Sequence, residues 1–436
     1  MYNELLEKFQ NSIEGLRDFV DLIQPMLNEY HKKEFEKHDK AFAPLAIARQ
    51  IELETDDKKK SELQELLKEI FDGEINVTVE DEIEENELDE KTEEEHKKFS
   101  FNIKGDTTKI DEAFQFAVKS EEQRNLLYVN SLISLLSSAE WFYSQLLHFF
   151  YDKNPNAAGI KKKTLTLDEL KSFGTVEDAE KYLIDSKIEG LLRSSFSDWI
   201  DTLKSELGLG LGYLKEFLDE LIEIYQRRNL FVHNGGVVNS IYHSKVNQPE
   251  TSIGEKLTVT RDYLDNAIDK IHVLFSLIAC ELWKKELPED EARSDFLMEL
   301  NYGYLKQGKW TVAKLPNIFL TKDAAQPTIP KTYAQLNCWL CEKRLHGLDK
   351  VKTELAKQDF SDKTIVIQLA LAALKEEEDS FFDLLPRAIN SEELPVKYLF
   401  DFPILEEMRQ SEKFEEFVNS NDKVKEFQKN TEPNTQ

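Results

Sequence analysis

The chain has 436 residues and a formal net charge of −28 at pH 7. Its length predicts two or three domains, and a hydrophobic content of 40% excludes a disordered chain. No apolar run approaches the roughly 20 residues that span a bilayer, the first residues lack the pattern of a signal peptide, and three cysteines make no disulfide framework. We therefore expect a cytoplasmic protein that makes no membrane contact, and whose acidity opposes nucleic-acid binding through bulk electrostatics.

Few residues of the chain favour tight turns, since there are only 15 glycines and 12 prolines. Leu, Ile and Phe dominate the apolar set, which favours long helices over sandwiches or barrels. The sequence thus predicts a mainly all-α fold. Residues 1–110 are expected to form a helical N-terminal region, with two or three helices over residues 1–70 and apolar positions three and four apart from Leu5 to Leu27. A break near 56–60 precedes a helix that we expect to begin at Ser61, where the residue types match a capping box.

The N-terminal region also contains an acidic linker. Residues 74–95 hold twelve carboxylates and a single lysine. We interpret this stretch as a solvated linker, and the alternative is a phosphate mimic that covers a basic site. The alternating segments 75–79 and 99–103 predict a short β-hairpin at its two ends.

Residues 111–286 are predicted to form a compact helical domain. Capping hydroxyls followed by acidic residues mark two of its helix starts, and a Gly-Gly pair marks a helix end with a left-handed cap. The predicted elements are a helix over about 121–151, a break at 154–159, helix starts at Thr166 and Thr175, a helix over about 212–233 ending at Gly235-Gly236, an extended segment over 257–259 and a helix over about 261–285.

Residues 287–436 are predicted to form stacked helical hairpins. Leu300-Asn301 is echoed by Leu336-Asn337, an offset of 36 residues. The segment 302–313 resembles a tetratricopeptide hairpin, whose period is near 34 residues, although later units lack its Gly and Ala spacing. The resemblance implies an α-solenoid that offers a protein partner a binding surface.

The strongest candidate for chemistry is Arg228-Asn229-x-x-x-His233. The apolar stripe of its helix leads onto Arg228, where a charge is costly unless it is paired. His233 lies in the last turn, where the helix dipole stabilises an imidazolium. On the helix 121–151, Glu140 is the one carboxylate of an apolar stripe. We therefore expect a buried pair between Glu140 and Arg228.

These residues resemble the R-x4–6-H signature of the HEPN superfamily, and Ser138-Ala-Glu140 in the first long helix also matches the HEPN pattern. The resemblance covers about 115–285 and implies a central HEPN helical bundle that cleaves RNA without a metal or other cofactor. In such enzymes two HEPN domains form a homodimer with one composite site. His233 would then be the acid or base on the ribose 2′-OH and the leaving oxygen.

The resemblance assigns the remaining roles as well. Arg228 would stabilise charge on the scissile phosphate, and Asn229 would orient Arg228 or His233. Arg227 is a further candidate for RNA contact, and so is the basic run formed by Lys161, Lys162 and Lys163. Members of the superfamily often serve as toxins or anti-phage defence effectors, which is the biological role implied here.

A different class of function stays open at this point. Some HEPN domains are inactive, so the chain is alternatively a non-catalytic dimerisation scaffold whose solenoid binds a protein. Arg228 and His233 would then be a satisfied polar cluster in a helix bundle. Cys338 and Cys341 lie three residues apart, but no second such pair exists, and we interpret them as packing residues rather than zinc ligands.

Overall fold

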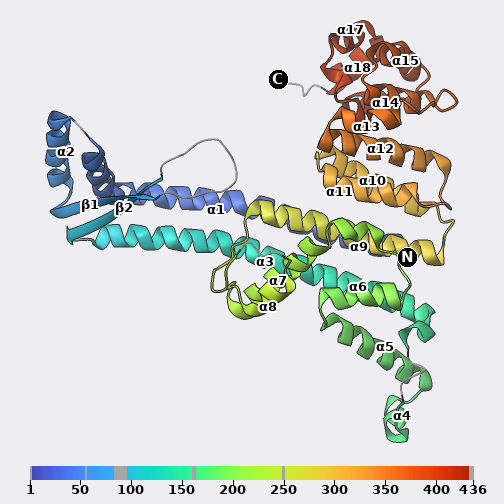
Figure 1. Cartoon of the computed structure of the whole chain (residues 1–436), viewed down its shortest axis with the longest axis horizontal. Helices are drawn as coiled ribbons and strands as arrows, with labels where there is room; N and C mark the ends of the chain where they lie inside the picture. Colours follow the sequence, from blue (N-terminus) through green and yellow to red (C-terminus); the bar gives the residue numbers. More distant parts are fainter. Residues whose placement is uncertain (1, 55, 83–95, 160–163, 248–250, 432–436) are drawn as a thin grey trace. The chain divides into compact units, whose positions relative to one another are not determined.

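The computed structural model describes residues 2–54, 56–82, 96–159, 164–247 and 251–431. Within these ranges the chain is helical apart from one two-stranded sheet (Figure 1), which confirms the predicted all-α fold. None of the described helices combines the length and the apolar character that a membrane span requires.

The chain divides into two compact units. The smaller unit is Gly15–Ser131 with Thr258–Thr260, and the larger unit is Met1–Glu14, Leu132–Leu257 and Arg261–Gln436. The domain boundaries predicted after residues 110 and 286 stay a prediction.

The smaller unit is built on two long antiparallel helices. It takes most of α1 (Tyr2–Leu53) and the first half of α3 (Thr108–Lys153), which run side by side in Figure 1. A hydrogen bond of 2.8 Å joins the two helices, between Nε2 of His31 and the side-chain oxygen of Gln123. The rings of Phe35 and Phe116 also meet edge-on, with their centres 5.0 Å apart. This unit is thus held by contacts between residues about 80 to 90 positions apart.

One end of the smaller unit carries α2 (Asp57–Ile70) and the predicted hairpin, which is confirmed. Strands β1 (Gly73–Glu82) and β2 (His96–Gly105) pair antiparallel, with Ile75 opposite Ile103 and Val77 opposite Phe101. Because side chains alternate along a strand, these apolar residues share one face. That face packs on a small core that includes Leu45, Phe71 and Ile110.

The predicted start of the second helix at Ser61 is wrong. Helix α2 begins at Asp57, because the Asp56 carboxylate accepts hydrogen bonds from the backbone N–H groups of Lys58 and Lys59. This cap satisfies two of the helix's free N–H groups four residues earlier than expected. Residues 2–53 form one continuous helix, so the described part of residues 1–70 holds two helices, in agreement with the two or three that were predicted.

The larger unit begins with a helical bundle around α9. The rings of Phe9 and Phe142 stack with their centres 4.3 Å apart, and both lie near the ring of Phe275 in α9. Helix α9 is buried along most of its length. The elements of the bundle, besides the start of α1 and the second half of α3, are η1 (Pro155–Ala158), α4 (Leu167–Phe173), α5 (Val176–Leu192), α6 (Phe196–Ser205), η3 (Gly212–Glu216), α7 (Leu218–Asn234), α8 (Ser240–Lys245) and α9 (Arg261–Glu286).

Most predicted elements of this region are confirmed, and three are corrected. Thr166 and Thr175 cap α4 and α5 as expected. The helix predicted over 121–151 begins earlier, at Thr108. The helix predicted from 212 begins at Leu218, because the Glu281 carboxylate accepts the N–H groups of Gly210 and Leu211 and holds a separate turn there. The extended segment at 257–259 is reduced to one isolated bridge, between Val237 and Lys256.

Residues 287–431 form successive packed helices, as predicted. The pairs α10–α11 and α14–α15 pack as helical hairpins, and α12 packs against α11, α13 and α14. The likeness to tetratricopeptide repeats itself stays a prediction. The elements are α10 (Ala292–Lys306), α11 (Trp310–Thr321), α12 (Thr328–His346), α13 (Leu348–Leu355), α14 (Ile365–Lys375), α15 (Glu378–Asn390), α16 (Val396–Asp401), η4 (Pro403–Leu405), η5 (Met408–Gln410), α17 (Glu412–Ser420) and α18 (Asp422–Thr431).

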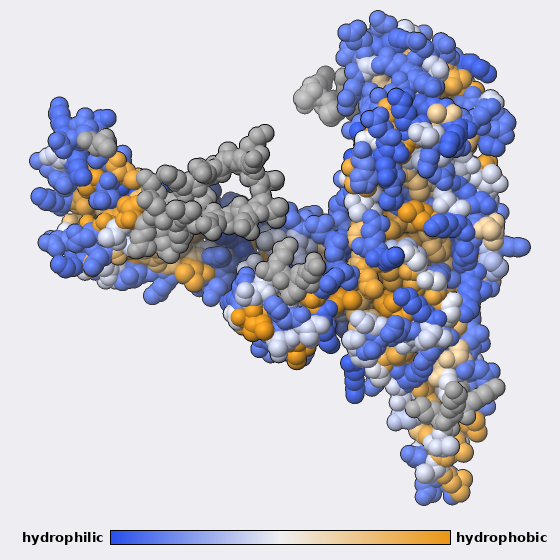
Figure 2. All heavy atoms as spheres, in the orientation of Figure 1, coloured by the Kyte–Doolittle hydropathy of each residue, from blue (hydrophilic) through white to orange (hydrophobic). Residues whose placement is uncertain are grey.

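The outer surface of these C-terminal helices is mainly hydrophilic in the view of Figure 2. Their apolar side chains gather instead in a second core, which includes Leu369, Phe381 and Leu399.

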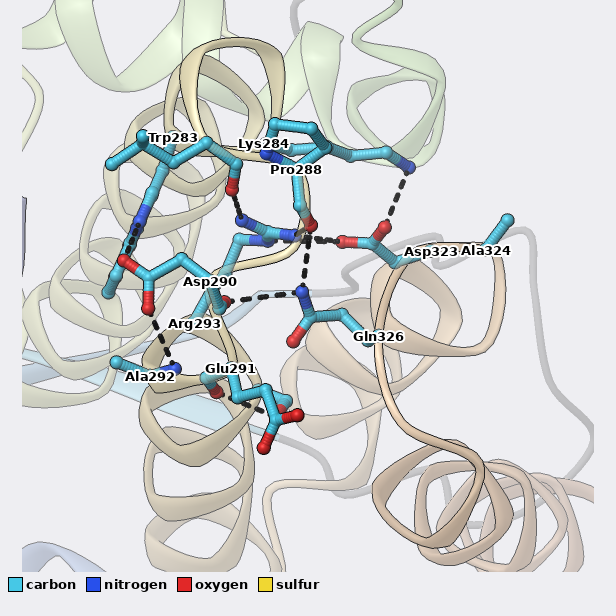
Figure 3. Close-up of polar contacts among 12 residues, drawn as sticks. Trp283, Lys284, Pro288, Asp290, Glu291, Ala292, Arg293, Asp323, Ala324 and Gln326 are labelled. Carbon is cyan, nitrogen blue, oxygen red and sulfur yellow. Dashed lines mark hydrogen bonds and ion pairs between the residues drawn. The ribbon is translucent and has the colours of Figure 1, made fainter.

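A fully buried ionic cluster fastens the first C-terminal helices to the end of α9 (Figure 3). The Arg293 guanidinium donates to the backbone oxygens of Leu287 and Pro288 at 2.8 and 2.5 Å, and to the Asp323 carboxylate at 3.0 Å. Gln326 donates to the same Pro288 oxygen at 3.1 Å. We call these residues the Arg293 cluster. It ties the turn before α10 to the turn after α11, because every group that it joins comes from one of these two turns or from the start of α10.

Candidate active site in the Arg228–His233 cleft

The motif helix α7 ends as the sequence predicts. Gly235 adopts a left-handed conformation with φ of 62°, and its N–H donates to the Leu230 carbonyl. Gly236 follows with φ of 83°, and its N–H reaches the same oxygen at 3.1 Å. Glycine permits these angles without strain. The cap ends the helix at Asn234, one residue after His233, which lies exposed in the last turn.

The predicted pair between Glu140 of α3 and Arg228 of α7 is confirmed. Nη2 of Arg228 donates to Oε1 of Glu140, and Nη1 donates to the side-chain oxygen of Asn229 at 3.2 Å. The pair is less buried than predicted, since 17% of the Arg228 side chain and 31% of the Glu140 side chain are exposed. Burial lowers the pKa of the Arg228 guanidinium from its ordinary value, but an arginine stays charged at neutral pH.

The guanidinium of Arg228 is oriented by two side chains that also line the cleft described next. Nη2 donates to Glu140 and Nη1 donates to Asn229. The remaining nitrogen, Nε, is buried and has no hydrogen-bond partner within the described ranges. A fixed cation of this kind suits an oxyanion, because its orientation is set before the anion arrives.

Arg228 lines a cleft of about 530 Å³ together with Glu140, Asn229 and His233. The structure thus brings together the four residues that the sequence singled out as catalytic candidates. Other walls of the cleft come from the turn between α5 and α6, which contributes Arg193, and from α8, which contributes Lys245. The site is therefore assembled from α3, α6, α7, α8 and the end of α5.

Aromatic rings make the cleft rigid. The Phe196 ring stacks on Tyr225 at 4.5 Å, and Trp199 stacks on Tyr143 at 4.6 Å. Trp199 also donates its indole N–H to the Leu191 carbonyl at 2.6 Å. These contacts join α3, α6 and α7 beneath the polar residues, and such stacked pairs hold a fixed geometry.

Arg227 belongs to a neighbouring cluster and does not line the cleft. It donates to Glu223 at 2.6 Å, and its guanidinium lies 4.2 Å from the centre of the Tyr263 ring. The hydroxyls of Tyr242 and Tyr263 donate to the same Glu223 carboxylate at 2.8 and 2.7 Å. Burial raises the pKa of both tyrosines, so both remain hydroxyl donors. The predicted RNA contact of Arg227 stays a prediction, but its side chain is occupied in tying α7 to α8 and α9.

Two sequence predictions fall outside the described residues. Lys161, Lys162 and Lys163 lie in the undescribed segment 160–163, and most of the acidic linker lies in 83–95. The two predicted packing thiols are described. Cys341 of α12 is buried and Cys338 is half-buried, and burial raises the pKa of the Cys338 thiol to about 12. The described ranges contain no group of three or more His, Cys, Asp or Glu side chains that could hold a metal ion.

Sequence reasoning missed Arg193 and Lys245. Both are exposed cations in the sequence neighbourhood of other charges, so no local signal separates them from ordinary surface residues. In the described part of the cleft lining, Arg193, Arg228 and Lys245 are cations and Glu140 is the only acid. Three positive charges and one negative give the lining a net charge of +2, in a chain whose total is −28.

Comparisons with known proteins identify no relative. No family model matches the chain, and searches of curated proteins and of solved structures also found no match. The function is therefore inferred from the residues and the geometry of the cleft.

Proposed function

We propose that this protein is a metal-independent endoribonuclease of the HEPN type. One observation carries the proposal: a single cleft contains an arginine that is oriented by Glu140 and Asn229, and an exposed histidine at the end of the same helix. An oriented cation and a side chain that can accept or donate a proton are what the cleavage of RNA by its own 2′-OH requires.

The proposed reaction uses these groups as follows. His233 accepts the proton of the ribose 2′-OH while O2′ attacks the adjacent phosphorus. The P–O5′ bond breaks, and O5′ receives a proton from a second histidine. The products are a 2′,3′-cyclic phosphate and a 5′-hydroxyl end. Arg228 stabilises the charge of the phosphorane, and Glu140 and Asn229 act as positioning residues for Arg228.

Local charge supports an RNA substrate. The net charge of the chain would repel RNA, but the cleft lining carries +2. The Debye length is about 8 Å at physiological ionic strength, so charges on distant surfaces are largely screened at the cleft. The positive lining therefore adds a local attraction for a phosphate that the net charge of the whole chain does not cancel at that distance.

The second histidine is proposed to come from a second copy of the chain, in a homodimer. Trp141, Val232 and Ile241 are 46%, 47% and 59% exposed, and each is either next to a proposed site residue in sequence or part of the cleft lining. Exposed apolar side chains beside a polar cleft favour a surface that another protein molecule covers, here a second copy of the chain. Light scattering at micromolar concentration tests the dimer, and a strict monomer would contradict the composite site.

The biological role proposed from the family resemblance is a cytoplasmic toxin or anti-phage defence effector, with a protein partner on the C-terminal helices. The alternative function is a non-catalytic dimerisation scaffold. One observation favours this alternative: both terminal nitrogens of Arg228 already have protein partners, as in a polar cluster that only stabilises the bundle.

RNA cleavage by the full chain separates the two functions. The experiment compares the wild-type protein with His233→Ala and uses His346→Ala as the control, since His346 is an exposed histidine on α12 outside the cleft. We expect wild-type and control proteins to cleave single-stranded RNA in the presence of EDTA, leaving cyclic phosphate ends. His233→Ala should be slower by roughly 100-fold or more while remaining folded. Equal rates for His233→Ala and His346→Ala would remove the ribonuclease proposal.

A further inference from the structure

The rim of the cleft carries two cations that the proposed chemistry does not use. Arg193 is the C-cap residue of α5, and Lys245 is the last residue of α8. Both side chains line the cleft and both residues are exposed. They come from segments 52 positions apart in the sequence that the fold brings to the same cleft.

Neither cation is strongly held by the protein. Arg193 donates to Glu189 at 3.1 Å, but these side chains are 81% and 67% exposed, and such surface pairs contribute little stability. In the described part of the chain, the ammonium group of Lys245 forms no hydrogen bond or ion pair. Its charge does act on Asp198, whose pKa is lowered mainly by hydrogen bonds with Ser195 and further by Lys245.

The other polar groups of this rim are already used. The Ser195 N–H donates to Asp198 at 2.9 Å, and the Asp198 N–H donates back to the Ser195 hydroxyl at 3.3 Å. This capping box closes the start of α6 to an incoming anion. The side chain of Asn239 accepts the N–H of Tyr242 at 3.0 Å and thereby fixes the start of α8. Arg193 and Lys245 are therefore the rim groups that can attract an anion.

We propose that Arg193 and Lys245 bind backbone phosphates of single-stranded RNA, next to the phosphate that lies at Arg228. This inference rests on the proposed ribonuclease function and deepens it. The phosphates of a strand repeat along the chain, so a strand that places one phosphate inside the cleft carries its neighbours over the rim. A single strand fits this arrangement better than a duplex, because its unpaired backbone can bend into a cleft of about 530 Å³.

Binding is measured with a fluorescent 12-nucleotide strand in which every 2′-OH is methylated, so that the full chain binds it without cleaving it. The variants are Arg193→Ala and Lys245→Ala. Their matched controls are Arg387→Ala and Lys204→Ala, which remove exposed cations of α15 and α6 that do not line the cleft. Anisotropy titrations at several salt concentrations give the affinity and the slope of log K against log salt.

Each rim variant should bind several-fold more weakly at low salt and should reduce the salt slope by about 0.7, the value for one lost contact with a single strand. The controls should keep the wild-type slope. Rim variants that match their controls would overturn the proposal, and so would a duplex of the same sequence that binds more tightly than the single strand.

Cleavage of unmodified RNA is measured separately, which keeps the two proposals apart. A smaller salt slope without any cleavage by the wild-type chain would leave the rim site standing and remove the ribonuclease. Cleavage by the wild-type chain with unchanged slopes for both rim variants would do the reverse.

Discussion

The Glu140–Arg228 pair allows a prediction of stability whose magnitude follows from its exposure. Breaking a fully buried ion pair by removing one partner costs about 3–5 kcal/mol, and breaking an exposed pair costs about 0–1 kcal/mol. With 31% and 17% of the two side chains exposed, the pair lies between these limits. We therefore expect Glu140→Ala and Arg228→Ala each to lower the free energy of unfolding by about 2 kcal/mol.

The double variant distinguishes a paired charge from two independent losses. Once Glu140 is absent, Arg228 is a half-buried charge without its counter-ion, so its removal should cost close to nothing more. Glu140→Ala with Arg228→Ala should then lose about 2 kcal/mol in total, which corresponds to a coupling energy of about 2 kcal/mol. Glu140→Gln keeps a hydrogen-bond acceptor for Arg228 and should lose about 1 kcal/mol.

Urea unfolding followed by circular dichroism measures these differences. Glu189→Ala is the control, because it breaks the exposed pair with Arg193 and should change stability by less than about 0.5 kcal/mol. His233 is exposed, so His233→Ala should resemble this control in stability while it abolishes cleavage. Single losses that add in the double variant, or that do not exceed the control, would mean that water solvates the pair and that Glu140 does not position Arg228.

Three further predictions concern other parts of the larger unit. Arg293→Ala should lower the free energy of unfolding by about 3–5 kcal/mol, because it leaves the fully buried Asp323 without its main counter-charge; thermal unfolding measures this. Gly236→Ala should lower the free energy of unfolding by more than about 1 kcal/mol, because its φ is positive and a Cβ there would lie 2.6 Å from a ring carbon of Phe231. Gly303→Ala in α10 is the control: its Cβ meets no atom within 4 Å, and the variant should be more stable by about 0.5–1 kcal/mol in the same assay. Residues 1–286 expressed alone should aggregate or unfold at a lower temperature, as seen by light scattering, because the truncation removes helices that cover α9.

Much of the motif helix could be predicted from the sequence because its signals are local. The stripe that leads to Arg228 and the glycines after His233 both act within a few turns of one helix. The inward carboxylate on another helix then identified Glu140 as the partner. One turn beyond Arg228 on the same stripe, Val232 is 47% exposed, so the stripe does not stay buried to the end of α7.

Features that depend on the packing of distant segments could not be predicted. Arg193 and Lys245 read as ordinary surface charges, and only the packing of α5 and α8 makes them part of one cleft. Arg293 and Asp323 also read as surface charges, since charged residues are rarely buried completely. Their burial follows from two turns 30 residues apart that close on each other. The predicted start of α7 was wrong for a similar reason, because the carboxylate of Glu281, in the distant helix α9, holds the turn before α7.

The bond between Glu140 and Arg228 spans 88 positions of the chain, and this has a consequence during protein synthesis. A ribosome makes Glu140 first, then the residues of the cleft wall up to Lys245, and later Tyr263, whose hydroxyl holds Glu223 on the motif helix. A nascent chain that ends before α7 lacks Arg228 and His233, and one that ends before Tyr263 lacks a hydroxyl that holds Glu223 on the motif helix. The described lining of the cleft is therefore complete only once Lys245 has been made, and its support by α9 follows later still.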